Sequence, residues 1–333
     1  MVAVFGKPFK PHNHGKEPIL TGVTYLDLTD PNDVGQRVDN FLLRHLKGVP
    51  RQRVYRLLRK GEVRVNGGRV KATYRLQMHD RVRIPPVRQG QRMPLQISQA
   101  LGRQLVDSVL YEDEDYLVID KPAGVAVHGD AANEAGVVEI LRETLDLPRL
   151  ELVHRIDRHT SGCLALAKNR LALQAAQQQF RLRRVKKIYD LFVVGAWEAR
   201  VRTIQARLTR YTTDWGERRV KVDPSGRQAR TDVVILDQAG ALATRLQASL
   251  HTGRTHQIRV HVSSHNHPIL GDDRYALRHQ AGGADLAACQ PPRMCLHASR
   301  LVIPLQDREL RVVAPLDPVL TEYWAALKQA AAG

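Results

Sequence analysis

Glu151-Leu152-Val153-His154-Arg155-Ile156-Asp157-Arg158-His159-Thr160-Ser161-Gly162-Cys163-Leu164-Ala165-Leu166-Ala167-Lys168 is the stretch around which this chain is organised. One carboxylate, that of Asp157, stands between two arginines and two histidines, and a Thr-Ser-Gly turn and a short apolar run follow it. The length of the apolar run predicts a buried strand. Nearby positive charge favours the ionised carboxylate, which suits covalent attack or the stabilisation of a cationic transition state. The alternative for such a residue is an ion pair that only fixes the loop.

A second dense polar cluster lies about a hundred residues further along the chain. In it, the apolar residues Ile258 and Val260 alternate with Arg259 and His261. Alternation with a period of two is typical of a strand. We therefore expect a strand here, with a polar face that meets Asp157.

The composition indicates a globular protein without membrane spans. The chain has 333 residues, enough for two domains, and 43% of them are apolar. It contains no run of eighteen apolar residues, and residues 1–16 lack the apolar core of a secretory signal. Cys163, Cys289 and Cys295 are odd in number and have no C-x-x-C spacing. Neither a disulfide framework nor a zinc site is expected, and a reducing cytoplasm fits best.

Charge gives the clearest global indication of a partner. Lys and Arg number 51 against 34 Asp and Glu, a net charge of +17. Fifteen of the basic residues but only three of the acidic ones lie between Gly35 and Arg88. A merely solvated basic face normally carries compensating acids, so this segment predicts a surface for a polyanion such as RNA.

The same basic segment predicts a small fold of two helices and a hairpin. Apolar residues recur at helical spacing from Val38, and a second helix begins near Pro50 and ends at Gly61. Asn66-Gly67 is a strong hairpin turn. The basic side chains that we expect to contact RNA are Arg53, Arg56, Arg59, Lys60 and Arg64.

Two stretches of this segment carry a family resemblance. Gly35-Gln36-Arg37-Val38-Asp39, followed by Arg59-Lys60-Gly61-Glu62-Val63-Arg64-Val65-Asn66-Gly67, resembles the alpha-L RNA-binding domain of ribosomal small-subunit protein four. The resemblance spans roughly residues 35–85. It implies an RNA-binding domain at the start of the chain.

The rest of the chain predicts a larger α+β domain. Short strands over 109–111 and 116–119, helices over 136–145 and from the N-cap Asn169 to about 183, and a strand over 186–194 do not follow a regular βαβ order. We therefore expect a mixed, largely antiparallel sheet. The predicted organisation is a flexible tail over 1–20, an alpha-L type RNA-binding domain over 21–87, a linker over 88–106 and a catalytic domain over 107–333.

Several blocks of the second domain resemble the RluA-type pseudouridine synthases, in the order and at the spacing of that family. The central block is His154-Arg155-Ile156-Asp157-Arg158-His159-Thr160-Ser161-Gly162. The other blocks are Asp120-Lys121-Pro122-Ala123-Gly124, Lys187-Ile188-Tyr189, residues 253–261, residues 267–272 and Leu296-His297-Ala298. Ile156 stands where the family usually has Leu, and His159 where it usually has an acid.

The resemblance implies that the protein isomerises uridine to pseudouridine in RNA, most notably in large-subunit ribosomal RNA or a pre-ribosomal particle. It implies that Asp157 is the essential carboxylate, acting at the ribose or the base, and that Tyr189 stacks under the uracil and is a candidate for proton removal from C5. Arg259 would pair with Asp157, and Arg155 would fill the gap left by a flipped-out nucleotide. No cofactor, metal or membrane is implied, and we expect a monomer.

Three other functions are weighed against this one. A kinase is excluded because His154-Arg155-Ile156-Asp157 has one residue too many for an H-R-D loop and no glycine-rich phosphate loop accompanies it. A glycoside hydrolase needs two carboxylates with distinct roles, and one is offered. A non-catalytic RNA-binding or ribosome-assembly protein explains the charge but leaves the motifs at Asp157 and Arg259 without a purpose.

Overall fold

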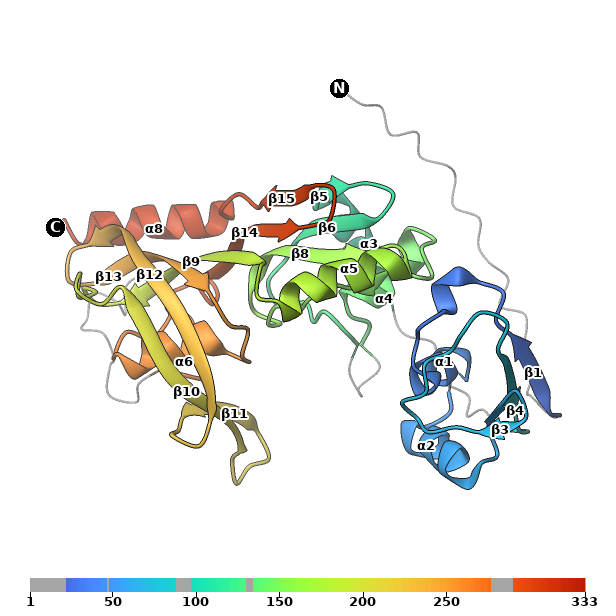
Figure 1. The fold of residues 1–333 in the computed structure, drawn as a ribbon. Helices are drawn as coiled ribbons and strands as arrows, with labels where there is room; N and C mark the ends of the chain where they lie inside the picture. Colours follow the sequence, from blue (N-terminus) through green and yellow to red (C-terminus); the bar gives the residue numbers. More distant parts are fainter. Residues whose placement is uncertain (1–21, 47, 88–96, 130–133, 277–289, 333) are drawn as a thin grey trace. The chain divides into compact units, whose positions relative to one another are not determined.

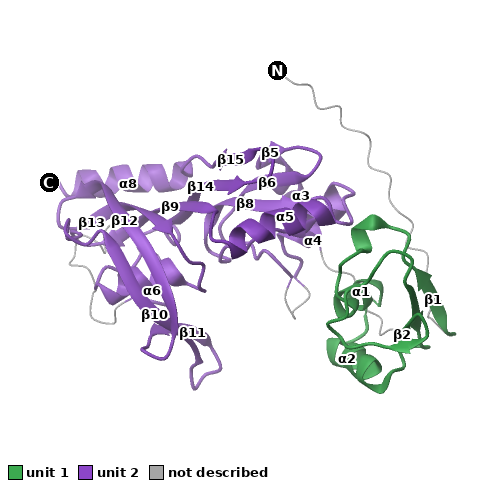
Figure 2. Ribbon diagram, viewed as in Figure 1, with its two compact units in different colours: residues 1–94 green, residues 95–333 purple. Residues whose placement is uncertain are grey.

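The computed structural model describes residues 22–46, 48–87, 97–129, 134–276 and 290–332. The chain divides into two compact units, residues 1–94 and residues 95–333 (Figure 1, Figure 2). The predicted tail over 1–20, residues 88–96 of the predicted linker, and Cys289 lie outside the described residues.

The first unit is a small four-stranded sheet with two helices. Its elements are β1 (Thr24–Asp27), the short 3-10 helix η1 (Pro31–Asp33), α1 (Val38–His45), α2 (Arg51–Lys60), β2 (Arg64–Val65), β3 (Gly68–Arg69) and β4 (Arg81–Ile84). The strand order is β1-β4-β2-β3, and all pairs are antiparallel. Phe41, Leu57 and Val82 belong to its buried core. The helix pair and hairpin expected from the sequence are confirmed.

The second unit is built on one eleven-stranded sheet within the described residues. Its strands are β5 (Val109–Glu112), β6 (Tyr116–Lys121), β7 (Glu151–Leu152), β8 (Ser161–Ala167), β9 (Lys186–Val194), β10 (Thr203–Thr212), β11 (Arg218–Val222), β12 (Arg227–Ala239), β13 (Ala243–Leu250), β14 (Leu296–Pro304) and β15 (Glu309–Val313). The main order is β11-β10-β12-β13-β9-β14-β8-β6-β5, with β15 beside β14 and β7 beside β8. Among the described strands only β14 and β8 pair in parallel, so the expected α+β fold with a largely antiparallel sheet is confirmed.

Five helices of the described residues pack on this sheet or on one another: α3 (Gln99–Asp107), α4 (Val137–Thr144), α5 (Arg170–Arg181), α6 (Gln257–Ser264) and α8 (Pro318–Ala330). Figure 1 shows α5 beside β8, and α6 near the long strands β10 and β12. Strand β8 is buried along its whole length because its alternate residues enter two different cores. Leu164 and Leu166 belong to the core that includes buried residues of α4, whereas Cys163 and Ala165 belong to the core that includes residues of α5 and β15. Burial on both faces explains the uninterrupted apolar run in the sequence.

Helix α5 follows the sequence prediction closely. The Asn169 side chain accepts a hydrogen bond from the backbone N–H of Ala172 and so caps the helix. This bond satisfies one of the backbone donors left free at a helix start. The strands predicted over 109–111, 116–119 and 186–194 are likewise present as β5, β6 and β9.

The predicted linker over 88–106 is wrong in its second half, because α3 begins at Gln99 and belongs to the second unit. Ser98 caps α3 by accepting a hydrogen bond from the N–H of Leu101, and Leu105 is fully buried. Gly102 lets α3 approach α4, since a Cβ there would lie 2.8 Å from Oγ1 of Thr144. A glycine in mid-helix and a polar composition hid this element in the sequence.

The strand predicted around Arg259 is also wrong, because Gln257–Ser264 form helix α6. Ile258, Arg259, Val260 and His261 are all buried, so the helix has no solvated face that would show a helical period. The polar residues in the alternating pattern are buried rather than exposed, because each has a specific polar partner. His261 Nδ1, for example, lies 2.9 Å from Oγ1 of Thr231.

Candidate active site

The loop that carries Asp157 leaves the sheet at the end of β7 and returns at β8. The backbone N–H of Val153 donates to Ala165 O over 3.1 Å, and the N–H of Ala165 donates to Nε2 of His154 over 3.1 Å. The imidazole thus takes the place of a strand partner where the loop turns away. Burial lowers the pKa of His154 to about 3, which keeps the ring neutral and able to accept this bond.

The Thr-Ser-Gly turn after Asp157 is fixed by close backbone contact. The N–H of Thr160 donates to Asp157 O over 3.1 Å and closes the turn. Gly162 has φ of +107° and pairs with Ala298 in the parallel register of β8 and β14. A Cβ at Gly162 would lie 2.4 Å from Ala298 O, so only glycine fits this position.

The Asp157 carboxylate meets two cationic or polar groups from the second motif. Its Oδ2 lies 3.4 Å from Nη1 of Arg259 and 3.8 Å from Nε2 of His256. The Asp157 side chain keeps 29% of its surface exposed, whereas the Arg259 side chain keeps 6%. The acid can therefore meet a substrate while the cation beside it is enclosed by protein.

Arg259 is held mainly by a different carboxylate, that of Asp272. Its Nε and Nη2 each donate to Asp272 over 2.7 Å, a bidentate buried pair. The ring of Tyr275 lies against the guanidinium, with 5.0 Å between Cζ and the ring centroid. The Tyr275 hydroxyl is 2.7 Å from Nδ1 of His256. Asp272 and Tyr275 therefore orient the two side chains that face Asp157.

Tyr189 lies on β9 and is largely buried. Burial, together with the negative charge of Asp157, raises the pKa of the Tyr189 phenol well above its ordinary value. The phenol therefore stays protonated at neutral pH.

Lys121 ties a third motif to the Asp157 loop. Its Nζ donates to the carbonyl oxygens of Pro122, Val125 and Arg158 over 2.7, 2.9 and 3.0 Å. Gly124 adds two bonds of 2.8 Å to Arg158: its N–H donates to Arg158 O, and its carbonyl oxygen accepts from Arg158 Nε. The pKa of Lys121 is lowered to about 7, because the effect of burial exceeds the opposite effect of the nearby Asp157 charge. Three carbonyl acceptors match the three donors of an ammonium group.

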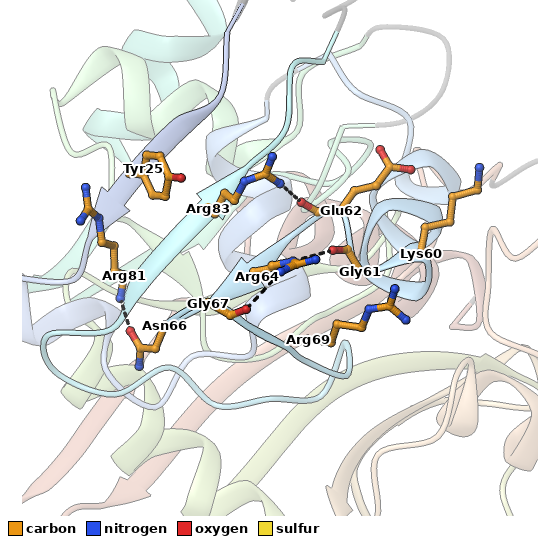
Figure 3. Close-up of a pocket in the computed structure, with 10 residues that line it drawn as sticks. All are labelled: Tyr25, Lys60, Gly61, Glu62, Arg64, Asn66, Gly67, Arg69, Arg81 and Arg83. Carbon is orange, nitrogen blue, oxygen red and sulfur yellow. Dashed lines mark hydrogen bonds between the residues drawn. The ribbon is translucent and has the colours of Figure 1, made fainter.

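The residues expected to contact RNA lie at several places. Arg155 is exposed on the Asp157 loop and has no hydrogen bond or ion pair within the described residues. Arg56 and Arg59 are exposed on α2, and Arg53 is half-buried. Lys60 and Arg64 line a pocket of the first unit (Figure 3).

That pocket is strongly basic. Its lining residues are Tyr25, Lys60, Gly61, Glu62, Arg64, Asn66, Gly67, Arg69, Arg81 and Arg83. Arg83 donates to Glu62 O over 2.7 Å, and the guanidinium of Arg81 lies 4.5 Å from the Tyr25 ring centroid (Figure 3). Five cations face a single acid here, which suits a phosphate backbone.

The sequence alone assigned no role to His256, Asp272, Tyr275 or Lys121. Three of them stand in the motif blocks of the family, but their contacts depend on the three-dimensional fold. The sequence around them gave one indication: ionisable residues stand among apolar ones, a pattern typical of buried ionisable groups that are paired with one another.

No group of three His, Cys, Asp or Glu side chains is arranged to hold a metal ion in the described part of the chain. Nor does any helix of that part have the length and apolar character needed to cross a membrane.

Comparison with known proteins gives consistent matches. The family model for RNA pseudouridylate synthase matches residues 115–264, and the model for the S4 domain matches residues 36–82. Ribosomal large subunit pseudouridine synthase C of Pasteurella multocida (strain Pm70) is 43% identical over 318 residues, covering 94% of this chain and 97% of that protein. The protein of the same name from Yersinia pestis is 44% identical over 315 residues, covering 92% and 97%.

A solved structure agrees with these sequence matches. Human RNA pseudouridylate synthase domain containing 4 superposes with a TM-score of 0.58 at 25% identity, covering 69% of this chain and 96% of that one.

Proposed function

Because the chain belongs to the family of RNA pseudouridine synthases, we propose that it acts on defined uridines of large-subunit ribosomal RNA and that Asp157 is its essential carboxylate. The relatives that match over almost the whole chain are named for that RNA, which supports the substrate. The observation that carries the assignment of Asp157 is its half-exposed carboxylate 3.4 Å from the enclosed Arg259.

The reaction is an isomerisation. The N1–C1′ bond of uridine breaks, a C5–C1′ bond forms, and one proton leaves C5 while another joins N1. Atoms and electrons balance without an oxidant, a reductant or a second substrate. The protein must bind the flipped nucleotide, stabilise charge and move a proton, all of which side chains can do.

The site suggests a role for each side chain. Asp157 meets the nucleotide as an anion, and Arg259 and His256 hold it in position from one side. The ring of Tyr189 offers a flat apolar surface for the uracil. A protonated phenol cannot act as a base at neutral pH, so we assign Tyr189 to stacking and leave proton removal from C5 to a group with a lower pKa.

The first unit supplies affinity. We propose that the basic pocket around Lys60 and Arg64 binds RNA phosphates, and that Arg53, Arg56 and Arg59 extend this surface along α2. Flipping a uridine out of its stack costs a few kcal/mol, and binding across two units offsets it. Arg155, exposed beside Asp157, is our candidate for filling the vacated stack.

We further propose that the functional domains are residues 21–87 and the catalytic domain, which α3 extends to about residue 97 rather than 107. A ribosomal substrate implies a cytoplasmic protein, and the absence of a coiled-coil pattern in the sequence favours a monomer. The alternative of a non-catalytic RNA-binding protein leaves the Asp157 and Arg259 geometry without a purpose.

The experiment that tests this function is a pseudouridine map of large-subunit ribosomal RNA from cells that carry the wild-type protein, Asp157→Asn or no copy of it. Sites that vanish in both altered strains establish the substrate and the carboxylate together. Purified Asp157→Asn should still bind RNA, because the change leaves the basic surfaces intact. Persistence of every site in all three strains would exclude this substrate.

A further inference from the structure

The Lys187 side chain is a partly buried cation for which the described residues provide no counter-ion. It lies on β9 two residues before Tyr189, and alternate residues of a strand point to the same face. No carboxylate or hydrogen-bond acceptor of the described residues contacts its amino group. Its neighbour on the opposite face, Lys186, is exposed to solvent.

Two segments of the candidate site meet at this amino group, β9 and the turn that contains Gly253. The Nζ atom lies 3.8 Å from the position that a Cβ on Gly253 would occupy, so it contacts the turn that leads from β13 to α6. The positive charge of Lys187 also contributes, after burial, to the lowered pKa of His154. The amine thus lies beside the turn that leads into α6, on the strand that carries Tyr189 and on the same face as Tyr189.

An unpaired ammonium in such surroundings is unfavourable in the free protein. Burial alone lowers the pKa of Lys187 to about 8, and no acid raises it again. At neutral pH most of the amine still carries its charge. Proteins keep unpaired buried charges mainly where a ligand supplies the missing partner.

We propose that Lys187 binds a backbone phosphate of the substrate RNA, at or next to the nucleotide whose base lies on Tyr189. This inference rests on the proposed function. Residues two apart on a strand are separated by about 6.6 Å, a distance that a single nucleotide spans between its base and its phosphate. Gly253 leaves room for the phosphate because it has no side chain beside the amine.

The test compares Lys187→Met with Lys186→Met in the full-length protein. Both changes remove one positive charge from adjacent residues of β9, but only the first faces the site. We expect Lys187→Met to bind substrate RNA about tenfold more weakly and to lower the slope of log affinity against log salt by about 0.7 to 0.9. Lys186→Met should change neither, and Lys187→Arg should restore binding. Equal effects of the two methionine variants would overturn the proposal.

A phosphate scan locates the contact. Methylphosphonate is substituted in turn at each phosphate flanking the target uridine, and affinity is measured for the wild type and Lys187→Met. The wild type should lose affinity at one phosphate to which Lys187→Met is insensitive. If methylphosphonate at every position weakened the binding of Lys187→Met as much as that of the wild type, a direct contact between Lys187 and one phosphate would be contradicted.

Stability separates this role from a structural one. Removing an unpaired buried charge should leave the melting temperature of Lys187→Met equal to or above that of Lys186→Met. A lower value would show that the amine has a structural partner and would overturn the proposal. If the wild type makes no pseudouridine at all, the proposed function fails, but the comparison of binding remains decisive for the phosphate contact.

Discussion

Arg259 donates two hydrogen bonds of 2.7 Å to Asp272, one from Nε and one from Nη2. Its third nitrogen, Nη1, is the one that reaches Asp157, over 3.4 Å. The tight pair fixes the guanidinium, and the looser contact leaves Asp157 able to engage another molecule. The guanidinium donors of Arg259 are thus divided between two acids, one held tightly and one loosely.

Asp272→Asn should therefore impair both folding and turnover. Breaking a buried ion pair costs about 3 kcal/mol, and loss of the fixed guanidinium should lower kcat about a hundredfold through misplacement of Asp157. Denaturant unfolding and single-turnover kinetics, measured well below the melting temperature, separate the two effects. KM should change little, because Asp272 is buried and is not among the residues proposed to bind RNA.

Asp273→Asn is the matched control, since Asp273 is adjacent and exposed. It should leave stability and kcat unchanged. An Asp272→Asn protein with wild-type kcat would mean that Asp157 does not depend on Arg259 for its position.

His154 predicts a specific dependence of stability on pH. Its pKa is about 3 in the folded chain and ordinarily 6.5, so below pH 6.5 the unfolded chain binds a proton that the folded chain refuses. The stability contributed by neutral His154 is therefore complete above pH 6.5 and is lost as the pH falls. At pH 5 the loss is about 2 kcal/mol.

The measurement is urea unfolding of the wild type and His154→Gln at pH 7 and pH 5. The variant should lose less stability on acidification than the wild type does. Burial also lowers the pKa of His261 to about 4, but His261 is present in both proteins and its effect cancels. An identical loss in both proteins would show that His154 is not the titrating group.

Gly162→Ala should destabilise the protein strongly, by about 3 kcal/mol or more, because it combines a left-handed backbone with a backbone clash. Gly216→Ala is the control: Gly216 also has positive φ, +79°, but a Cβ there meets nothing within 4 Å. It should cost about 1 kcal/mol. Thermal or urea unfolding of both variants measures the difference, and equal values would argue against the close contact with Ala298.

The basic pocket predicts a graded effect on RNA binding. Replacing Arg64 and Arg69 by alanine should weaken affinity and lower the salt slope by about two, one for each phosphate that is no longer bound. The same change at Arg53 and Arg56 on α2 should have a smaller effect, since neither lines the pocket. Both double variants should keep kcat at saturating RNA. Equal salt slopes for the two would mean that the α2 face contributes as much as the pocket.

The sequence was sufficient for elements whose signals are local. The N-cap Asn169 and the uninterrupted apolar run of β8 determine their structures within a few residues. The prediction of a strand around Arg259 failed because a helix buried on all sides loses its helical period, and tertiary contacts then decide the conformation. Helix α3 was missed because Gly102 serves packing against Thr144, which no local pattern reveals.

The candidate site was predictable in part. Asp157 and Arg259 were expected to meet, and the structure brings them to 3.4 Å. The dominant partner of Arg259, Asp272, was not expected, because an ion pair depends on where two loops lie in space rather than on spacing along the chain. The same is true of the three carbonyls around Lys121.

The position of β14 has a consequence for synthesis of the protein. This strand begins at Leu296 and lies in the sheet between β9, which carries Tyr189, and β8, which follows Asp157. In a nascent chain that has not yet reached residue 296, no strand joins β9 to β8, and each of these two strands has an open edge. The sheet that carries the candidate site is therefore complete only after β14 has been synthesised. A protein truncated after Cys295 should be inactive and prone to aggregation, although it contains every side chain assigned to the chemistry.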